Sequence, residues 1–120
     1  MTELQKIEEF TLFILLHMGH VDGSLHPNER DTIVDRMKQL FPEHPSVEES
    51  LIEMEVHYRS LKYGSAEIIL KEGFQKFSHV DPAKRLEIYA SIFDIINANG
   101  RINEEETQTL QFMKTWFTAG

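Results

Sequence analysis

The sequence of 120 residues contains no cysteine, so structural disulfides, thiolate zinc sites and thiol nucleophiles are excluded. Basic residues are scarce: 12 lysines and arginines stand against 20 aspartates and glutamates, giving a formal net charge of −8. Such an excess of negative charge repels phosphate backbones and anionic lipids. We therefore expect no nucleic-acid partner.

The sequence also lacks a long apolar run. The apolar stretch Phe10 to Leu16 is too short for a membrane span and follows the acids of MTELQKIEEF, which is the wrong flank for a signal peptide. We expect a cytoplasmic protein without membrane insertion. A chain of this length most simply forms one domain, residues 1–120.

Apolar residues recur at helical spacing nearly everywhere, as at Leu51, Met54, Tyr58 and Leu61. No convincing strand alternation is present. The pattern predicts an all-α fold, a single compact bundle of about six to seven helices. Helices are expected near residues 3–20, 27–40, 47–61, 65–77, 82–98 and 104–117. Asp81, followed by Pro82 at the first helical position, is expected to cap the fifth of these helices, and Asn103 the last.

The chain also repeats itself. A shift of 77 positions aligns LLHMGHVDGSLHPNERDTI, residues 15–33, with IFDIINANGRINEEETQTL, residues 92–110. Gly23 then meets Gly100, Glu29 meets Glu106, and Asp22 meets Asn99. The repeat predicts two helix-turn-helix pairs with pseudo-two-fold symmetry, joined by a middle section of two helices.

The repeated motif reads VDGSLHPNE at Val21–Glu29 and ANGRINEEE at Ala98–Glu106. A helix, Ala-Asp-Gly-x-apolar-x-x-x-Glu and a second helix near each end of an all-helical domain resemble the tellurite-resistance TerB-like family. The resemblance covers nearly the whole chain and implies a non-catalytic domain of stress-response systems, whose acidic turns are suspected of holding divalent metal. Val21 and Asn99 depart from the family pattern, and Asn99 removes one charge.

Two interpretations of these turns stay open. In the first, Asp22, Glu29, Asn99 and Glu106 form one shared oxygen site for Ca²⁺ or Mg²⁺, provided that the two turns lie close together. Each turn alone lacks the opening ligands of an EF-hand loop, which needs six to eight oxygens for Ca²⁺. In the second, the glycines end helices, and Glu29 and Glu106 cap the next helix from its third position.

Other candidate sites are weaker. His17, His20 and His26 surround the first turn, but ILLHM favours His17 as a core residue over a transition-metal ligand. The face formed by Glu49, Glu53 and His57 is more often solvent-exposed than chelating. The aromatic residues at helical spacing are expected in the core, with an exposed docking patch as the alternative for the last pair: Phe74, Phe77, Tyr89, Phe93, Phe112, Trp116 and Phe117.

Five glutamates and no lysine or arginine lie between Gln39 and Tyr58, which predicts a negative surface suited to cations or basic protein segments: Glu43, Glu48, Glu49, Glu53 and Glu55. No nucleophile-and-base signature or phosphate-binding loop is present, so we expect no enzyme. The favoured hypothesis is a non-catalytic TerB-like module that binds a divalent cation and an unidentified protein partner. The alternative is a metal-free protein-interaction domain.

Overall fold

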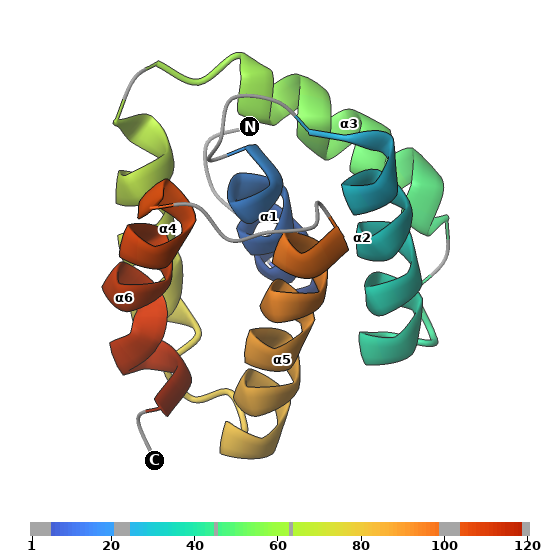
Figure 1. Cartoon of the computed structure of the whole chain (residues 1–120). Helices are drawn as coiled ribbons and strands as arrows, with labels where there is room; N and C mark the ends of the chain where they lie inside the picture. Colours follow the sequence, from blue (N-terminus) through green and yellow to red (C-terminus); the bar gives the residue numbers. More distant parts are fainter. Residues whose placement is uncertain (1–5, 21–24, 45, 63, 99–103, 119–120) are drawn as a thin grey trace.

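The computed structural model of this polypeptide describes residues 6–20, 25–44, 46–62, 64–98 and 104–118. Within the helices, the side chains of residues 98, 105, 106, 112 and 115–118 are outside this description. The described residues form six helices and no strand (Figure 1). The helices are α1 (Ile7–His20), α2 (Pro27–Leu40), α3 (Val47–Arg59), α4 (Ser65–Lys76), α5 (Pro82–Ala98) and α6 (Glu104–Thr118).

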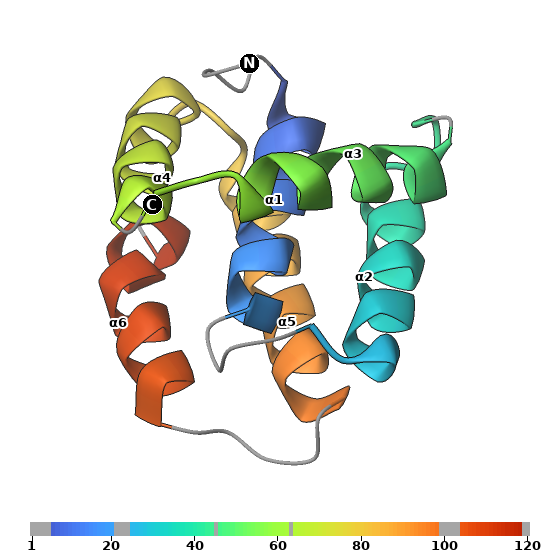
Figure 2. The same ribbon diagram turned by 90° about the horizontal axis from the view of Figure 1, so that it is seen from above.

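The first helix, α1, lies in the middle of the bundle (Figure 2). Ten consecutive residues, from Phe10 to Gly19, are buried, because α1 packs against α2, α3, α4 and α5. A helix that is apolar all round can be stable in water only when other elements surround it. The all-α bundle predicted from the sequence is thereby confirmed, and α1 is its core.

The observed helix boundaries agree closely with the predicted ones. Helices α2 and α5 have the predicted bounds, while α4 ends one residue earlier and α6 one residue later. Helix α3 ends at Arg59 instead of residue 61, since Ser60 takes the C-cap position and its hydroxyl donates to the carbonyl of His57 at 2.6 Å. Helix α1 begins at Ile7, and residues 3–5 of its predicted range lie outside the described residues.

Local capping explains the start of α5. The carboxylate of Asp81 accepts the backbone N–H of Ala83 at 3.0 Å, and Pro82 follows as the first helical residue. This is the capping predicted for Asp81. Asn103, the corresponding expected cap of α6, lies outside the described residues.

Aromatic rings fill the space between α1 and α4. Phe10 stacks on Phe77 at a centroid distance of 5.2 Å and meets Phe74 edge-on at 5.4 Å. On α5, Tyr89 and Phe93 contact each other at 5.2 Å and pack against the core. The core prediction is confirmed for these described aromatics, whereas the side chains of Phe112, Trp116 and Phe117 are outside the described part.

Polar contacts between helices fasten α5 to its neighbours. The ammonium group of Lys84 donates to the carbonyl of Leu40 at 2.8 Å and lies 5.1 Å from the centroid of the Phe41 ring. The guanidinium group of Arg36 on α2 lies 2.9 Å from the carboxylate of Asp94 on α5. These contacts fix the end of α2 against α5. Among the described helices, none is both long and apolar enough to cross a bilayer.

Gly73 on α4 allows the closest approach between α4 and α1. A Cβ atom at this position would overlap the ring of Phe10, which is fully buried and cannot swing away. Glycine is otherwise unfavourable inside a helix by about 1 kcal/mol relative to alanine. The close packing therefore explains why glycine occupies this helical position.

We predict that Gly73→Ala lowers the free energy of unfolding by about 1–3 kcal/mol, the usual cost of overpacking a core, although alanine is the better helix former. Urea unfolding monitored by circular dichroism measures this. The control is the same substitution in a Phe10→Leu background, where the smaller side chain leaves room for the added methyl group. An equal loss in both backgrounds would show that the Phe10 ring is not the cause.

Candidate functional site

The two glycine turns join helix ends that lie at the same end of the bundle. Helices α1 and α5 end there, and α2 and α6 begin there, in the lower half of the view in Figure 2. Gly19, near the end of α1, confirms part of this arrangement: a methyl group on it would lie 3.9 Å from both Ile33 Cδ1 and Ile95 Cγ2. The described flanks of the first turn therefore touch α5 close to its own end.

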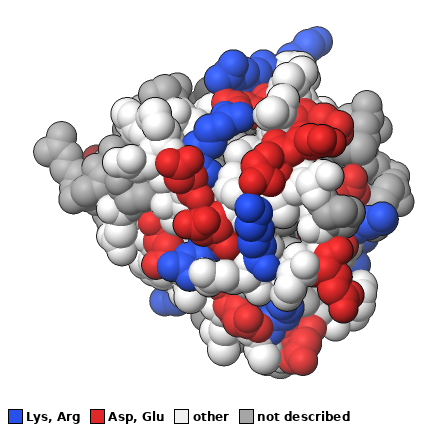
Figure 3. Space-filling view, turned by 90° about the vertical axis from the view of Figure 1, so that its right-hand side faces the viewer, with Lys and Arg blue, Asp and Glu red and all other residues white. Residues whose placement is uncertain are grey.

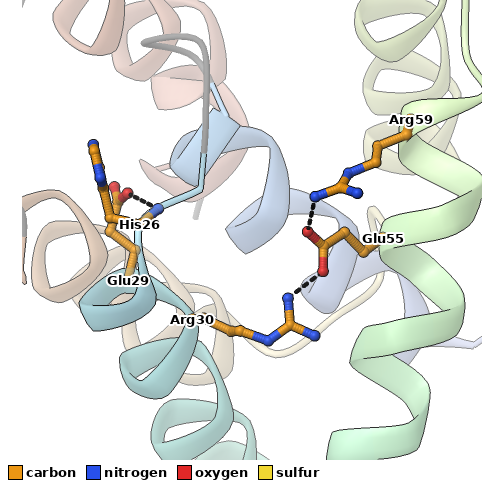
Figure 4. A network of polar contacts seen from close by, with 5 residues as sticks. All are labelled: His26, Glu29, Arg30, Glu55 and Arg59. Atoms are coloured by element: carbon orange, nitrogen blue, oxygen red, sulfur yellow. Dashed lines mark hydrogen bonds and ion pairs between the residues drawn. The ribbon is translucent and has the colours of Figure 1, made fainter.

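Glu29 is the one predicted ligand whose side chain is described. It is the third residue of α2, after the N-cap His26 and Pro27, and its exposed fraction is 0 %. Its Oε1 accepts the backbone N–H of His26 at 3.0 Å (Figure 4). The helix-capping role predicted for Glu29 is confirmed, and it compensates for the poor capping side chain of His26.

The other predicted ligands cannot be placed with the same detail. Asp22 and Asn99 lie outside the described residues. Glu106 is the third residue of α6, the position that Glu29 holds in α2, but its side chain is not described. Among the described residues, no group of three or more histidines, aspartates or glutamates is arranged to hold a metal ion.

The histidines near the first turn belong to a different feature. His17 and His20 share one face of α1, as predicted, and both contact Tyr58 of α3. His17 Nδ1 forms a 2.8 Å hydrogen bond with the Tyr58 hydroxyl, in which the tautomer of the ring decides the donor, while the His20 ring stacks on Tyr58 at 4.9 Å. His26 is exposed at the start of α2 and is not among the residues that line the pocket beside His17, His20 and Tyr58.

These rings form one wall of a pocket of about 570 Å³. Glu67 of α4 and Gln108 of α6 line it as well, so four helices contribute to it. Tyr58 and Glu67 were missed as polar partners of His17 by sequence reasoning. The only sequence signal for Tyr58 was its position in an apolar stripe, which predicts burial and not the hydrogen bond of its hydroxyl.

Burial determines the protonation of this pair. Desolvation lowers the pKa of His17; the negative charge of Glu67 opposes this effect, and His20 adds to it. Burial, with a contribution from Glu67, raises the pKa of Tyr58 to about 12. His17 is therefore neutral and Tyr58 keeps its proton at neutral pH, a state in which either group can donate in their hydrogen bond.

The negative surface predicted for Gln39 to Tyr58 is only partly negative in the fold. Glu48 pairs with Lys38 at 2.9 Å, and the buried Glu55 lies between Arg30 and Arg59, the second at 2.8 Å (Figure 4). Basic and acidic side chains consequently mingle on the face seen in Figure 3. The charges of Glu48 and Glu55 are thus compensated by basic side chains, and two of these, Arg30 and Lys38, come from α2.

The α3 face with Glu49, Glu53 and His57, expected to face solvent, is exposed at Glu49 and Glu53 and half-buried at His57. Glu53 and His57 line one pocket, of about 200 Å³, together with residues from the start of α1. Glu49 is exposed and is not among the residues that line it.

Comparison of the chain with family models, curated proteins and solved structures finds no match.

The His17–Tyr58 pair predicts a specific acid sensitivity. A histidine whose pKa is lowered by folding binds its proton more readily in the unfolded chain, so stability is lost as pH falls below the unfolded value of about 6.5 and towards the folded pKa. Above pH 6.5 this contribution does not change. For one proton the slope is at most about 1.4 kcal/mol per pH unit.

We expect His17→Gln, which preserves a hydrogen-bonding side chain beside Tyr58, to show a smaller loss of stability between about pH 7.5 and pH 5.5 than the wild type, because the titrating group is gone. Urea unfolding at both pH values measures the difference. His79→Gln is the matched control, since His79 is exposed and should leave the wild-type pH dependence intact. Indistinguishable pH dependences of wild type and His17→Gln would refute the assignment.

Proposed function

We propose that this chain is a non-catalytic helical module of the TerB-like type. It holds a divalent cation, Ca²⁺ or Mg²⁺, at the end of the bundle that carries both glycine turns, and it acts through a protein partner in a stress-response setting. The observation that carries the proposal is the position of Glu29. This buried carboxylate stands at the helix start of one motif, at the same end of the molecule as the helix start of the other.

The chemistry of the donors supports a hard cation. Carboxylate and amide oxygens are the ligands that Ca²⁺ and Mg²⁺ prefer. A carboxylate has about four lone-pair positions, so the capping bond to His26 leaves Glu29 able to ligate as well. In the proposed site Asp22, Glu106 and the amide oxygen of Asn99 supply the remaining protein ligands, and water completes the shell. With three carboxylates, binding is expected to be weak.

The motif resemblance adds a second, independent argument. Asp-Gly or Asn-Gly followed by an apolar residue and a glutamate occurs twice, at Val21–Glu29 and Ala98–Glu106, each time between two observed helices. The two-fold relation between these helix pairs stays a prediction. Such a two-fold relation would favour a shared cation site, because symmetry would give both turns the same shape.

A metal-free interaction domain is the second candidate, and one observation favours it. Glu29 already satisfies a backbone N–H at the start of α2, so the presence of a glutamate at this point of the motif has a structural explanation without any ion. In this case the motifs only connect helices, and function depends entirely on the protein surface.

Titration with Ca²⁺, Mg²⁺ and Mn²⁺ separates the two candidates. A cation bound only by the folded chain and present at ten times its Kd stabilises it by about 1.4 kcal/mol, which raises the melting temperature by several degrees. We expect this shift in the wild type, and we expect Asp22→Asn to abolish it without changing the stability of the metal-free protein. Differential scanning calorimetry and isothermal titration measure both quantities.

Asp31→Asn is the matched control, because it removes the same charge from an exposed position of α2 outside the turn. It should retain the wild-type response to cations. If none of the three ions at millimolar concentration shifts the melting temperature of the wild type, the metal-free candidate is the correct one.

A further inference from the structure

Two adjoining pockets form a groove at the other end of α1, away from the glycine turns. One has a volume of about 200 Å³ and lies between the start of α1 and α3; the other has about 590 Å³ and lies between the start of α1 and the segment after α2. They share Lys6, Glu8 and His44, and so they are continuous. We call the combined feature the N-terminal groove.

Carboxylates dominate the charged groups of the N-terminal groove. Glu8, Glu9, Glu43 and Glu53 line it, and Lys6 is the only lysine or arginine among its described lining residues. Glu8, Glu43 and Glu53 take part in no ion pair among the described residues. They differ in this respect from Glu48 and Glu55, whose charges are compensated within the fold.

The floor of the groove is apolar. Leu12 and Met54 are buried beneath the smaller pocket, and Leu40 and Phe41 line the larger one. The side chains of lysine and arginine combine an aliphatic stem with a charged head, which fits an apolar floor below a rim of carboxylates. Metal ions and free inorganic anions have no apolar surface to pack on this floor, and nucleic acid is repelled by the negative charge of the rim.

We propose that the N-terminal groove binds a short basic segment of a partner protein. Lysine or arginine side chains of the segment pair with Glu8, Glu43 and Glu53, and an intervening aliphatic side chain packs on Leu12 and Met54. The inference rests on the protein partner in the proposed function and gives it a chemistry, but it does not depend on the cation. Charge complementarity selects this occupant over a second copy of the chain, whose net charge is −8.

The test uses a fluorescent peptide of alternating lysine and leucine, titrated with protein in metal-free buffer and followed by fluorescence anisotropy. The triple variant Glu8→Gln, Glu43→Gln, Glu53→Gln should weaken binding at least about tenfold, which corresponds to about 1.4 kcal/mol. The control triple variant Asp31→Asn, Asp35→Asn, Glu72→Gln removes the same charge from exposed sites outside the groove. It should weaken binding less than about twofold. Circular dichroism verifies that both variants remain folded.

Two further peptides test the two parts of the recognition. Replacing lysine by glutamate should abolish binding, and replacing leucine by serine should weaken it, since the floor then has no apolar partner. Methyl resonances of Leu12 and Met54 should shift on addition of the original lysine–leucine peptide and not on addition of the peptide in which glutamate replaces lysine.

Equal losses in the two triple variants would overturn the proposal, because they would show attraction to the overall charge and not to the groove. The absence of peptide binding at low salt, or methyl shifts confined to other parts of the chain, would overturn it too. Concentration-dependent self-association that depends on Glu8, Glu43 and Glu53 would assign the groove to a second copy instead. Asp22→Asn should bind the peptide like the wild type, which separates this test from that of the cation.

Discussion

The burial of α1 on every side is the constraint on which the rest of the fold depends. A helix of 14 residues with ten consecutive buried positions has no face to offer to water, so the remaining helices must enclose it. The polar groups that α1 brings into the interior then need partners from the surrounding helices. His17 illustrates this: its imidazole is kept neutral by burial and is held by the hydroxyl of Tyr58 from α3. A core helix thus determines both the arrangement of the bundle and the protonation state of its histidine.

The two candidate binding regions lie at opposite ends of this helix. Helix α1 begins beside Glu8 and the N-terminal groove, and its other end precedes the first glycine turn; its 14 residues span about 21 Å at about 1.5 Å per residue. The two regions share no described residue. A cation at the turns and a basic segment in the groove can therefore bind at the same time. Any energetic coupling between them would pass through the helices that run from one region to the other, which include α1 and α2.

Sequence reasoning worked where a local signal was sufficient. Helical spacing and the Asp81-Pro82 pair located α5 to the residue, and the interval between His26 and Glu29 predicted the capping bond. It failed where the partner came from a distant part of the chain. Glu55 pairs locally with Arg59, four residues further along α3, but its second partner, Arg30, is 25 residues away in the sequence. The groove combines the start of α1 with α3 and the segment after α2, an arrangement that no single stretch of sequence encodes.

The contact of Lys84 with Leu40 also has a consequence for how the chain folds during synthesis. The last carbonyls of α2 lack partners within the helix, and one of them is satisfied by a lysine 44 residues further along. A nascent chain that ends before α5 lacks this cap, so the last turn of α2 gains the hydrogen bond of Lys84 only after α5 has emerged and docked. The stability of this turn is thereby tied to α5, a dependence that amide hydrogen exchange at the end of α2 would measure.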